Sequence, residues 1–294
     1  MTDLRQRRPA PDGLVWRRTK RFLTYAVLVF FALLFIMPFV LSIATTFKTV
    51  PDITANPVSL IADPEYGWTL DGLRALNRGS IQIPRWTLNS ILVTGAVVIG
   101  RVALASLAGY ALARLRFRGR LAIFALVVGV MAIPDIVMAI PRFLIMKELG
   151  ILNSYFGLII PLIFDAFAIF MMKQFFQQLP REIEEAAAID GATTFQTWRY
   201  VMLPLAAPAL IALTILATQG VWNEFLHALV AVPSEPDLRT LPVGLALLRG
   251  GFGDAQPWNA LLGASMITIL PIAIIFFTFQ RYFVQGVAAS GTKG

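Results

Sequence analysis

Long apolar runs without a charged side chain constrain this fold more than any other feature of the sequence. The first extends from Phe22 to Thr46 and contains no acidic or basic residue. About 20 apolar residues suffice for a helix to cross a bilayer, whereas the apolar core of a signal peptide has only about 7–15. The chain is 57% hydrophobic and 14% charged over 294 residues. These values predict an integral membrane protein whose first run is an uncleaved anchor.

Six long, predominantly apolar runs predict an all-α protein with six transmembrane helices. The expected spans cover residues 22–46, 89–113, 121–141, 151–172, 205–232 and 258–283. Outside them lie a basic tail (1–21), a polar loop (173–204) and a C-terminal tail (284–294). With the terminal segment counted from residue 281, the segments on the side of the termini hold 16 Lys and Arg residues, against 8 in the opposite loops. The excess predicts that both termini and the polar loop are cytoplasmic.

The polar loop is expected to form a helix, a turn and a second helix. Pro180 and the glutamates at 182, 184 and 185 suit the positive end of a helix dipole, and an alanine run follows them. Gly191 suits a left-handed helix end, and Thr193 or Thr194 can cap the next helix, whose apolar side chains stand at 195, 198 and 202. Few large apolar side chains on the first helix favour a groove in a protein. An amphipathic elbow on the bilayer surface is the alternative.

The spacing within this loop also matches a family pattern. Glu185-Ala186-Ala187, three residues, Gly191, nine residues, Val201, one residue and Leu203-Pro204 resemble the EAA loop of binding-protein-dependent ABC importer permeases, which have Ile where this chain has Val201. The resemblance implies the type I importer permease fold and coupling helices docked on a cytoplasmic ATPase dimer. The positions to which it assigns coupling are Glu184, Glu185, Ala186, Ala187, Asp190, Gly191, Leu203 and Pro204.

Further stretches are similar to the carbohydrate, maltose-type (MalG-like) branch of these permeases. They are residues 107–114, 149–155 and 222–225. The C-terminus resembles a tail that reaches into the ATPase dimer, which implies contacts from Gly291, Thr292, Lys293 and Gly294. The branch implies import of a di- or oligosaccharide across a bacterial plasma (inner) membrane. It also implies a second permease subunit and an extracytoplasmic solute-binding protein as partners, and no nucleic acid.

No nucleotide-binding or catalytic signature accompanies this resemblance. None of the five lysines stands in a Gly-Lys-Ser/Thr context, so ATP and Mg are expected on a separate ATPase subunit. The absence of cysteine excludes thiolate metal sites, and one histidine cannot build a metal cluster. We therefore expect no catalytic residue, metal or cofactor in this chain.

A few charged and polar side chains interrupt the expected spans. Arg101 and Asp165 have depths that agree within about 3 Å, so we expect them to pair or to share one polar cavity, either for packing or along the substrate path. Asp135, Asn223 and Glu224 lie nearer the outer ends, where they fit sugar recognition beside aromatic rings or a polar packing cluster. The histidine at 227 is expected at the membrane interface. Prolines at 134, 141, 161 and 271 permit kinks.

Three other functions remain as alternatives. A permease for a glycerol-phosphate-type polyol ester would carry the same coupling loop. A secondary transporter would need paired inverted halves, and no such repeat is visible in the sequence. A membrane scaffold without transport activity would have no use for coupling positions such as Glu185 and Gly191.

Overall fold

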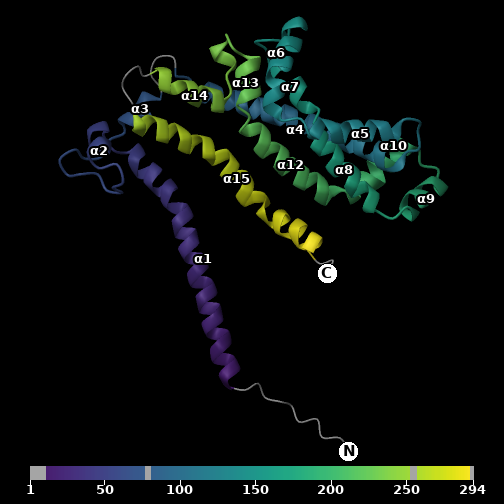
Figure 1. Cartoon of the computed structure of the whole chain (residues 1–294), viewed down its shortest axis with the longest axis horizontal. Coiled ribbons are helices and arrows are strands. Elements are labelled where there is room, and N and C mark those ends of the chain that lie inside the picture. Colours follow the sequence, from purple (N-terminus) through teal and green to yellow (C-terminus); the bar gives the residue numbers. More distant parts are fainter. Residues whose placement is uncertain (1–10, 77–80, 252–256, 292–294) are drawn as a thin grey trace, which may run out of the picture. The chain divides into compact units, whose positions relative to one another are not determined.

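The computed structural model describes residues 11–76, 81–251 and 257–291, and most of them are helical (Figure 1). Within these ranges, extended backbone pairs only in an isolated bridge between Lys48 and Trp68. The fold is therefore all-α, as predicted. The chain divides into two compact units. One consists of Met1–Ala75 and Pro257–Met266, the other of Leu76–Gln256 and Ile267–Gly294.

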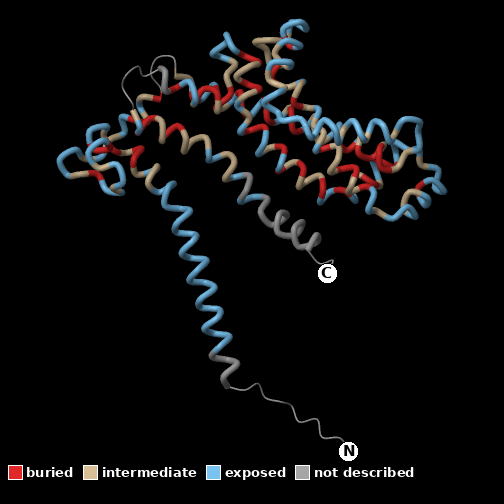
Figure 2. Tube along the Cα trace, in the orientation of Figure 1, coloured by how far each residue is buried: buried red, intermediate tan, exposed pale blue. Residues whose placement is uncertain are grey.

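The first unit begins with the long apolar helix α1 (Pro11–Thr46). Its part Trp16–Thr46 is long and apolar enough to cross a membrane, and none of its most apolar stretch is buried, as the pale blue tube in Figure 2 shows. The helix contains the predicted span 22–46 and continues upstream of it, so residues 11–21 of the predicted basic tail are helical. Such an uncovered apolar surface is suited to lipid or to another protein chain.

A buried ion pair organises the segment that follows α1. The short helices of this segment are α2 (Val50–Ala55) and α3 (Asp71–Ala75). Lys48 Nζ lies 3.5 Å from Asp52 Oδ2, and Asn259 donates from Nδ2 to the Lys48 carbonyl oxygen at 3.1 Å. Gly72 lies so close to Asn259 that a Cβ at Gly72 would be 2.8 Å from the Asn259 carbonyl carbon. These contacts join the predicted first outer loop to the beginning of the last helix.

The second unit is built around one long helix. Its main helices are α4 (Ile83–Arg114), α7 (Tyr155–Ile163), α8 (Ala166–Gln178) and α12 (Ala207–Trp222). α4 packs against the other three, most extensively against α8. Gly109 permits this approach, because a Cβ there would lie 2.6 Å from Met172 Cβ and 2.8 Å from Lys173 N. Buried apolar side chains form two clusters, one beside each half of α4.

The third expected span is sharply bent. It is formed by α5 (Arg120–Met131), the 3-10 turn η1 (Asp135–Met138) and α6 (Ala139–Glu148). The two helical parts meet at 100°, after Pro134 adopts an extended conformation with ψ 133°. Since α5 has 12 residues, it is about 18 Å long and shorter than a hydrocarbon core of about 30 Å. Where the sequence predicts one span over 121–141, the structure therefore has a bent pair.

The fourth and fifth expected spans are interrupted as well. α7 and α8 are separated by Phe164 and Asp165, whose backbones are extended. In the fifth span α12 ends at Trp222, and α13 (Leu226–Ala231) follows after three non-helical residues. Interrupted helices at membrane depth are tolerated where the freed backbone groups find partners or line a polar cavity.

The last part of the chain is helical almost to its end. The predicted outer loop 233–257 contains the turn η3 (Pro236–Leu238) and α14 (Leu241–Gly251). α15 (Trp258–Gly291) covers the predicted sixth span and continues beyond residue 283. Of the predicted tail contacts, Gly291 ends α15, whereas Thr292, Lys293 and Gly294 lie outside the described residues. The described residues contain three helices able to cross a membrane, or five if each bent pair counts as one, so six spans stay a prediction.

Candidate functional site

The polar loop forms the helix–turn–helix that the sequence predicts. Its elements are α9 (Glu182–Ile189), α10 (Thr194–Gln196), the π-helical turn η2 (Thr197–Met202) and α11 (Leu203–Leu205). Gly191 follows α9 with φ +81°, the left-handed conformation that glycine adopts without strain. Thr193 caps the second helix in a reciprocal capping box with Gln196. Pro180 precedes α9 rather than lying in its first turn, because the helix begins at Glu182.

The surface of α9 combines acidic and small side chains. The exposed residues are Glu185, Ala186, Asp190 and Gly191. Ala187 is buried on the side of α9 that packs against η2. Ile189 is 86% exposed. An exposed isoleucine beside alanines and carboxylates suits a shaped protein groove better than lipid, which would leave the carboxylates without water.

The second helix of the loop is fixed to the membrane bundle. Trp198 and Met202 are buried in the cluster beside the C-terminal half of α4, and Phe195 lies with its ring centroid 5.2 Å from that of Trp198. Leu203 and Pro204 form α11, after which the chain bends by 77° into α12. The loop is therefore a folded extension of the bundle.

Arg114 ties this loop to the end of α4. Its Nη2 donates to the Leu179 carbonyl oxygen, and its Nε lies 3.4 Å from Glu184 Oε2. Both side chains are well covered, at 5% exposure for Arg114 and 19% for Glu184. Of the predicted coupling residues, Glu184 thus faces inward to α4, while Glu185 faces outward. Sequence reasoning noted Arg114 only as part of a family stretch and missed this role, although a basic residue at a helix end beside an acidic loop is a visible signal.

The predicted pairing of Arg101 with Asp165 is confirmed. Arg101 Nη1 lies 3.2 Å from Asp165 Oδ2. Its Nε and Nη2 donate to the Leu162 carbonyl oxygen at 3.0 and 2.6 Å. Asp165 also accepts from the Ala168 N–H at 2.6 Å and so caps α8. The break between α7 and α8 would leave the Leu162 carbonyl without its helical partner, and Arg101 replaces that partner.

The break between α12 and α13 separates the other predicted polar residues. Glu224 Oε1 accepts from the His227 N–H at 2.8 Å at the start of α13. Asn223 is exposed and donates to Gln219 O at 2.8 Å. Trp222 is buried and donates from Nε1 to Thr268 O at 3.2 Å. The aromatic and polar side chains of this segment therefore do not face one cavity.

Two further residues that the sequence singles out, Asp135 and His227, have partners in the structure. Asp135 in η1 pairs with Arg142 in α6 at 2.6 Å, and both residues follow the bend after α5. His227 is buried and its Nε2 lies 3.0 Å from Gly157 O in α7, while its expected position at the membrane interface stays a prediction. A periodicity argument does not foresee this contact, because α13 is a short helix whose burial depends on α7.

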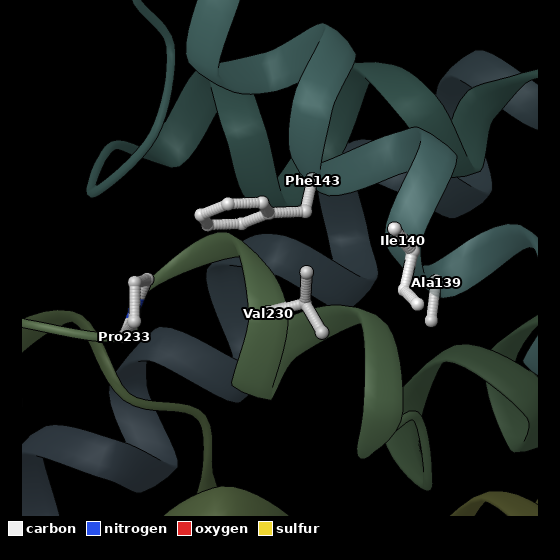
Figure 3. A pocket seen from close by; sticks show the side chains of 5 residues that line it. All are labelled: Ala139, Ile140, Phe143, Val230 and Pro233. Carbon is white, nitrogen blue, oxygen red and sulfur yellow. The ribbon is translucent and has the colours of Figure 1, made fainter.

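An apolar pocket of about 280 Å³ opens between α6 and the end of α13 (Figure 3). It is lined by Ala139, Ile140, Phe143, Val230 and Pro233. None of these side chains can hydrogen-bond a hydroxyl group, so the pocket does not have the chemistry of a sugar site. Among the described residues, no group of three or more His, Asp or Glu side chains is placed to hold a metal ion.

Comparison with known proteins decides the family. The model of the family described as "binding-protein-dependent transport system inner membrane component" matches residues 101–289. This chain belongs to that family. It is therefore a permease of a binding-protein-dependent system and a multi-pass membrane protein. The matched region includes Arg101, Asp165, the whole polar loop 173–204 and most of α15.

Relatives of the permease cover nearly its whole length. The arabinooligosaccharide transport permease AraQ of Halalkalibacterium halodurans is 35% identical, covering 95% of this chain and 99% of the relative. The trehalose/maltose transport permease MalG of Thermococcus litoralis is 34% identical, covering 94% and 98%. A bacterial ABC transporter that imports the acidic polysaccharide alginate contains a chain that matches with a TM-score of 0.75 and 25% identity, covering 90% of this chain and 97% of that one. The maltose-type branch expected from the sequence is thus confirmed.

Proposed function

We propose that this permease is one of two membrane subunits of an ATP-driven importer that moves a neutral di- or oligosaccharide into the cell. The observation that carries the proposal is the exposed face of α9, which includes Glu185, Ala186 and Ile189 and stands on a loop anchored to α4 by Arg114. This face is available to a cytoplasmic ATPase dimer, which would bind ATP and Mg. Closure of that dimer would move the coupling loop and switch the spans between inward- and outward-facing states.

The other partners follow from the same scheme. A second permease subunit would complete the pore, and the uncovered apolar surface of α1 suits contact with it and with lipid. A solute-binding protein would dock on the outer segments, including the residues around α14. Both termini would be cytoplasmic, and Gly291 to Gly294 would contact the ATPase.

The charges at the helix breaks support a neutral solute over a phosphate ester. Arg101 has the Asp165 carboxylate at 3.2 Å, so its charge is compensated within the protein. A site for an anion would keep a cation free to bind it. Carboxylates at a polar break instead accept hydrogen bonds from sugar hydroxyl groups.

Reconstitution tests this function directly. The permease, its co-purified subunits and the binding protein are placed in proteoliposomes containing ATP, and uptake of labelled maltotriose, arabinotriose and glycerol 3-phosphate is measured. The proposal expects uptake of a neutral sugar that stops with vanadate and continues with ionophores. Uptake abolished by ionophores and insensitive to vanadate would indicate a secondary transporter. Uptake of glycerol 3-phosphate alone would indicate the polyol-ester alternative.

A further inference from the structure

Two arginines of α4 hold α8 at its two ends by the same arrangement of contacts. Arg101 binds the Leu162 carbonyl oxygen at the end of α7 and pairs with Asp165, the cap of α8. Arg114 binds the carbonyl oxygen of Leu179, the residue that ends α8, and pairs with Glu184 in the first turn of α9. Each arginine therefore joins the end of one helix to the beginning of the next.

Between these two clamps the helices approach closely along their length. Gly109 lies against the backbone of Met172 and Lys173. At the next residue of α4, the Tyr110 ring contacts the Phe176 ring of α8 edge-on, with ring centroids 5.6 Å apart. Packed cores deform little, so two helices that interlock in this way and are fixed at both ends move as one body. The two arginines are 13 positions apart, or about 20 Å along α4.

The ends of this body lie at the two places where movement matters for transport. One end is the break at Phe164 and Asp165, where the backbone leaves the helical conformation. The other end is the beginning of the coupling loop at Leu179. The fourth span can bend at this break, because the backbones of Phe164 and Asp165 are extended and interrupt the helix.

We infer that α4 and α8 form a rigid coupling rod, and that Arg101 and Arg114 are positioning residues that transmit displacement of the coupling helix to the break between α7 and α8. This inference rests on the proposed function, since it assigns the route by which ATPase closure reaches the solute path. Arg114 sets the connection to the coupling loop, and Arg101 sets the connection to the break.

Functional coupling gives the first test. Arg114→Gln removes the pair with Glu184 and weakens the contact with Leu179. The matched control is Arg116→Gln, which removes the same charge from an exposed side chain two residues along the chain. In reconstituted transporter, Arg114→Gln is expected to lower sugar imported per ATP hydrolysed by about tenfold, while the ATPase remains active and the control stays within about twofold of wild type. Arg114→Lys keeps the charge but cannot contact both Leu179 and Glu184 as the guanidinium does. Its ratio of sugar imported to ATP hydrolysed is expected to lie between those of Arg114→Gln and Arg116→Gln.

Distance measurement tests the rod without relying on activity. The chain has no cysteine, so spin labels can be placed at Phe167 in α8 and Glu182 in α9, both of which are exposed. Their separation is expected to change by less than about 2 Å between nucleotide-free and ATP-trapped transporter. A second pair, at Phe156 in α7 and Glu182, spans the break and is expected to change more. Arg114→Gln should broaden the first distribution.

The outcomes separate the inference from the proposed function. If wild-type transporter shows no ATP-dependent uptake, the proposed function fails. If wild type imports sugar but Arg114→Gln keeps the wild-type ratio of sugar to ATP, the rod is refuted and the proposed function stands. A Phe167–Glu182 distance that changes as much as the Phe156–Glu182 distance would also refute the rod.

Discussion

Lys48 Nζ and Asp52 Oδ2 lie 3.5 Å apart, four residues from each other in the sequence, with side chains only 1% and 0% exposed. Such a pair is costly to break, because removing one partner leaves the other charge buried. Asp52 also accepts hydrogen bonds from Asn56 Nδ2 at 3.2 Å and from the Asp63 N–H at 3.3 Å. The two residues therefore hold together the segment between α1 and α3.

The first prediction concerns the pH dependence of this pair. Burial raises the pKa of Asp52, but the hydrogen bonds from Asn56 and Asp63 and the charge of Lys48 outweigh burial, so the pKa lies below its ordinary value of 3.8. A carboxyl group with a depressed folded pKa contributes stability above its unfolded pKa, and the contribution is lost as pH falls through the folded pKa. Asp52→Asn should therefore lower the melting temperature at neutral pH, and the difference from wild type should shrink below about pH 4.

Thermal unfolding of the detergent-purified protein at several pH values measures this effect. Asp71→Asn is the matched control, since Asp71 pairs with Arg74 at 3.6 Å at the surface of the same unit and exposed pairs contribute little. A difference between Asp52→Asn and wild type that stayed constant down to pH 3 would contradict the predicted role of the Asp52 charge.

The second prediction tests the contact between α4 and α8. Gly109→Ala would place a methyl group 2.6 Å from Met172 Cβ, so the two helices must separate. We expect a loss of about 1–3 kcal/mol in the free energy of unfolding. Gly95→Ala in the same helix meets no atom within 4 Å and should be neutral or stabilising, because alanine favours a helix by up to about 1 kcal/mol. Equal melting temperatures for the two variants would show that the helices tolerate separation.

The third prediction concerns the left-handed glycine of the coupling loop. Gly191 has φ +81° and open space around it, so Gly191→Ala introduces backbone strain of about 1–2 kcal/mol without a steric clash. Gly119 has φ +86° and equally open space, so Gly119→Ala adds comparable strain in the turn before α5. Only the change at Gly191 should lower sugar uptake per ATP hydrolysed, and Gly191→Asn should restore part of it. Equal losses in both alanine variants would assign the effect to strain alone.

The fourth prediction distinguishes the contributions of Arg101 and Asp165 to the stability of the fold. Arg101→Gln leaves the Asp165 carboxylate unpaired and the Leu162 carbonyl with a weaker donor, so we expect a loss of about 3 kcal/mol. Asp165→Asn keeps an acceptor for the Ala168 N–H and leaves the contact of Arg101 with Leu162, so its loss should be smaller. Thermal inactivation in detergent measures both. The reverse order would mean that Asp165, and not Arg101, holds the break together.

The structural features described above differ in how well they can be predicted from the sequence. The turn at Gly191 and the cap at Thr193 depend on neighbouring residues, so local conformational preferences predict them. The pairing of Arg101 with Asp165 follows from their depths, because a buried charge requires a partner. The break at Phe164 does not follow, since Pro161 signals a kink but not its position. The clamp at Arg114 and the burial of His227 depend on distant backbone carbonyls that no periodic pattern reveals.

The last prediction concerns the charge of the solute. If Asp165 and Glu224 face the solute path together with Arg101, Glu224→Gln removes one of the two carboxylates. The electrostatic repulsion of an anionic solute at this part of the path then decreases. The experiment compares uptake of a neutral trisaccharide with uptake of the same trisaccharide carrying one carboxylate. Since the binding protein is identical in all samples, its own preference cancels when the ratio for the variant is divided by that for wild type. We expect the ratio of charged to neutral sugar to rise several-fold, roughly the effect of one screened charge at close range. Asp135→Asn is the control, because that carboxylate is paired with Arg142 at the bend of the third span, and it should leave the ratio unchanged. An unchanged ratio in Glu224→Gln would remove Glu224 from the solute path and leave it only its hydrogen bond to the His227 N–H at the start of α13.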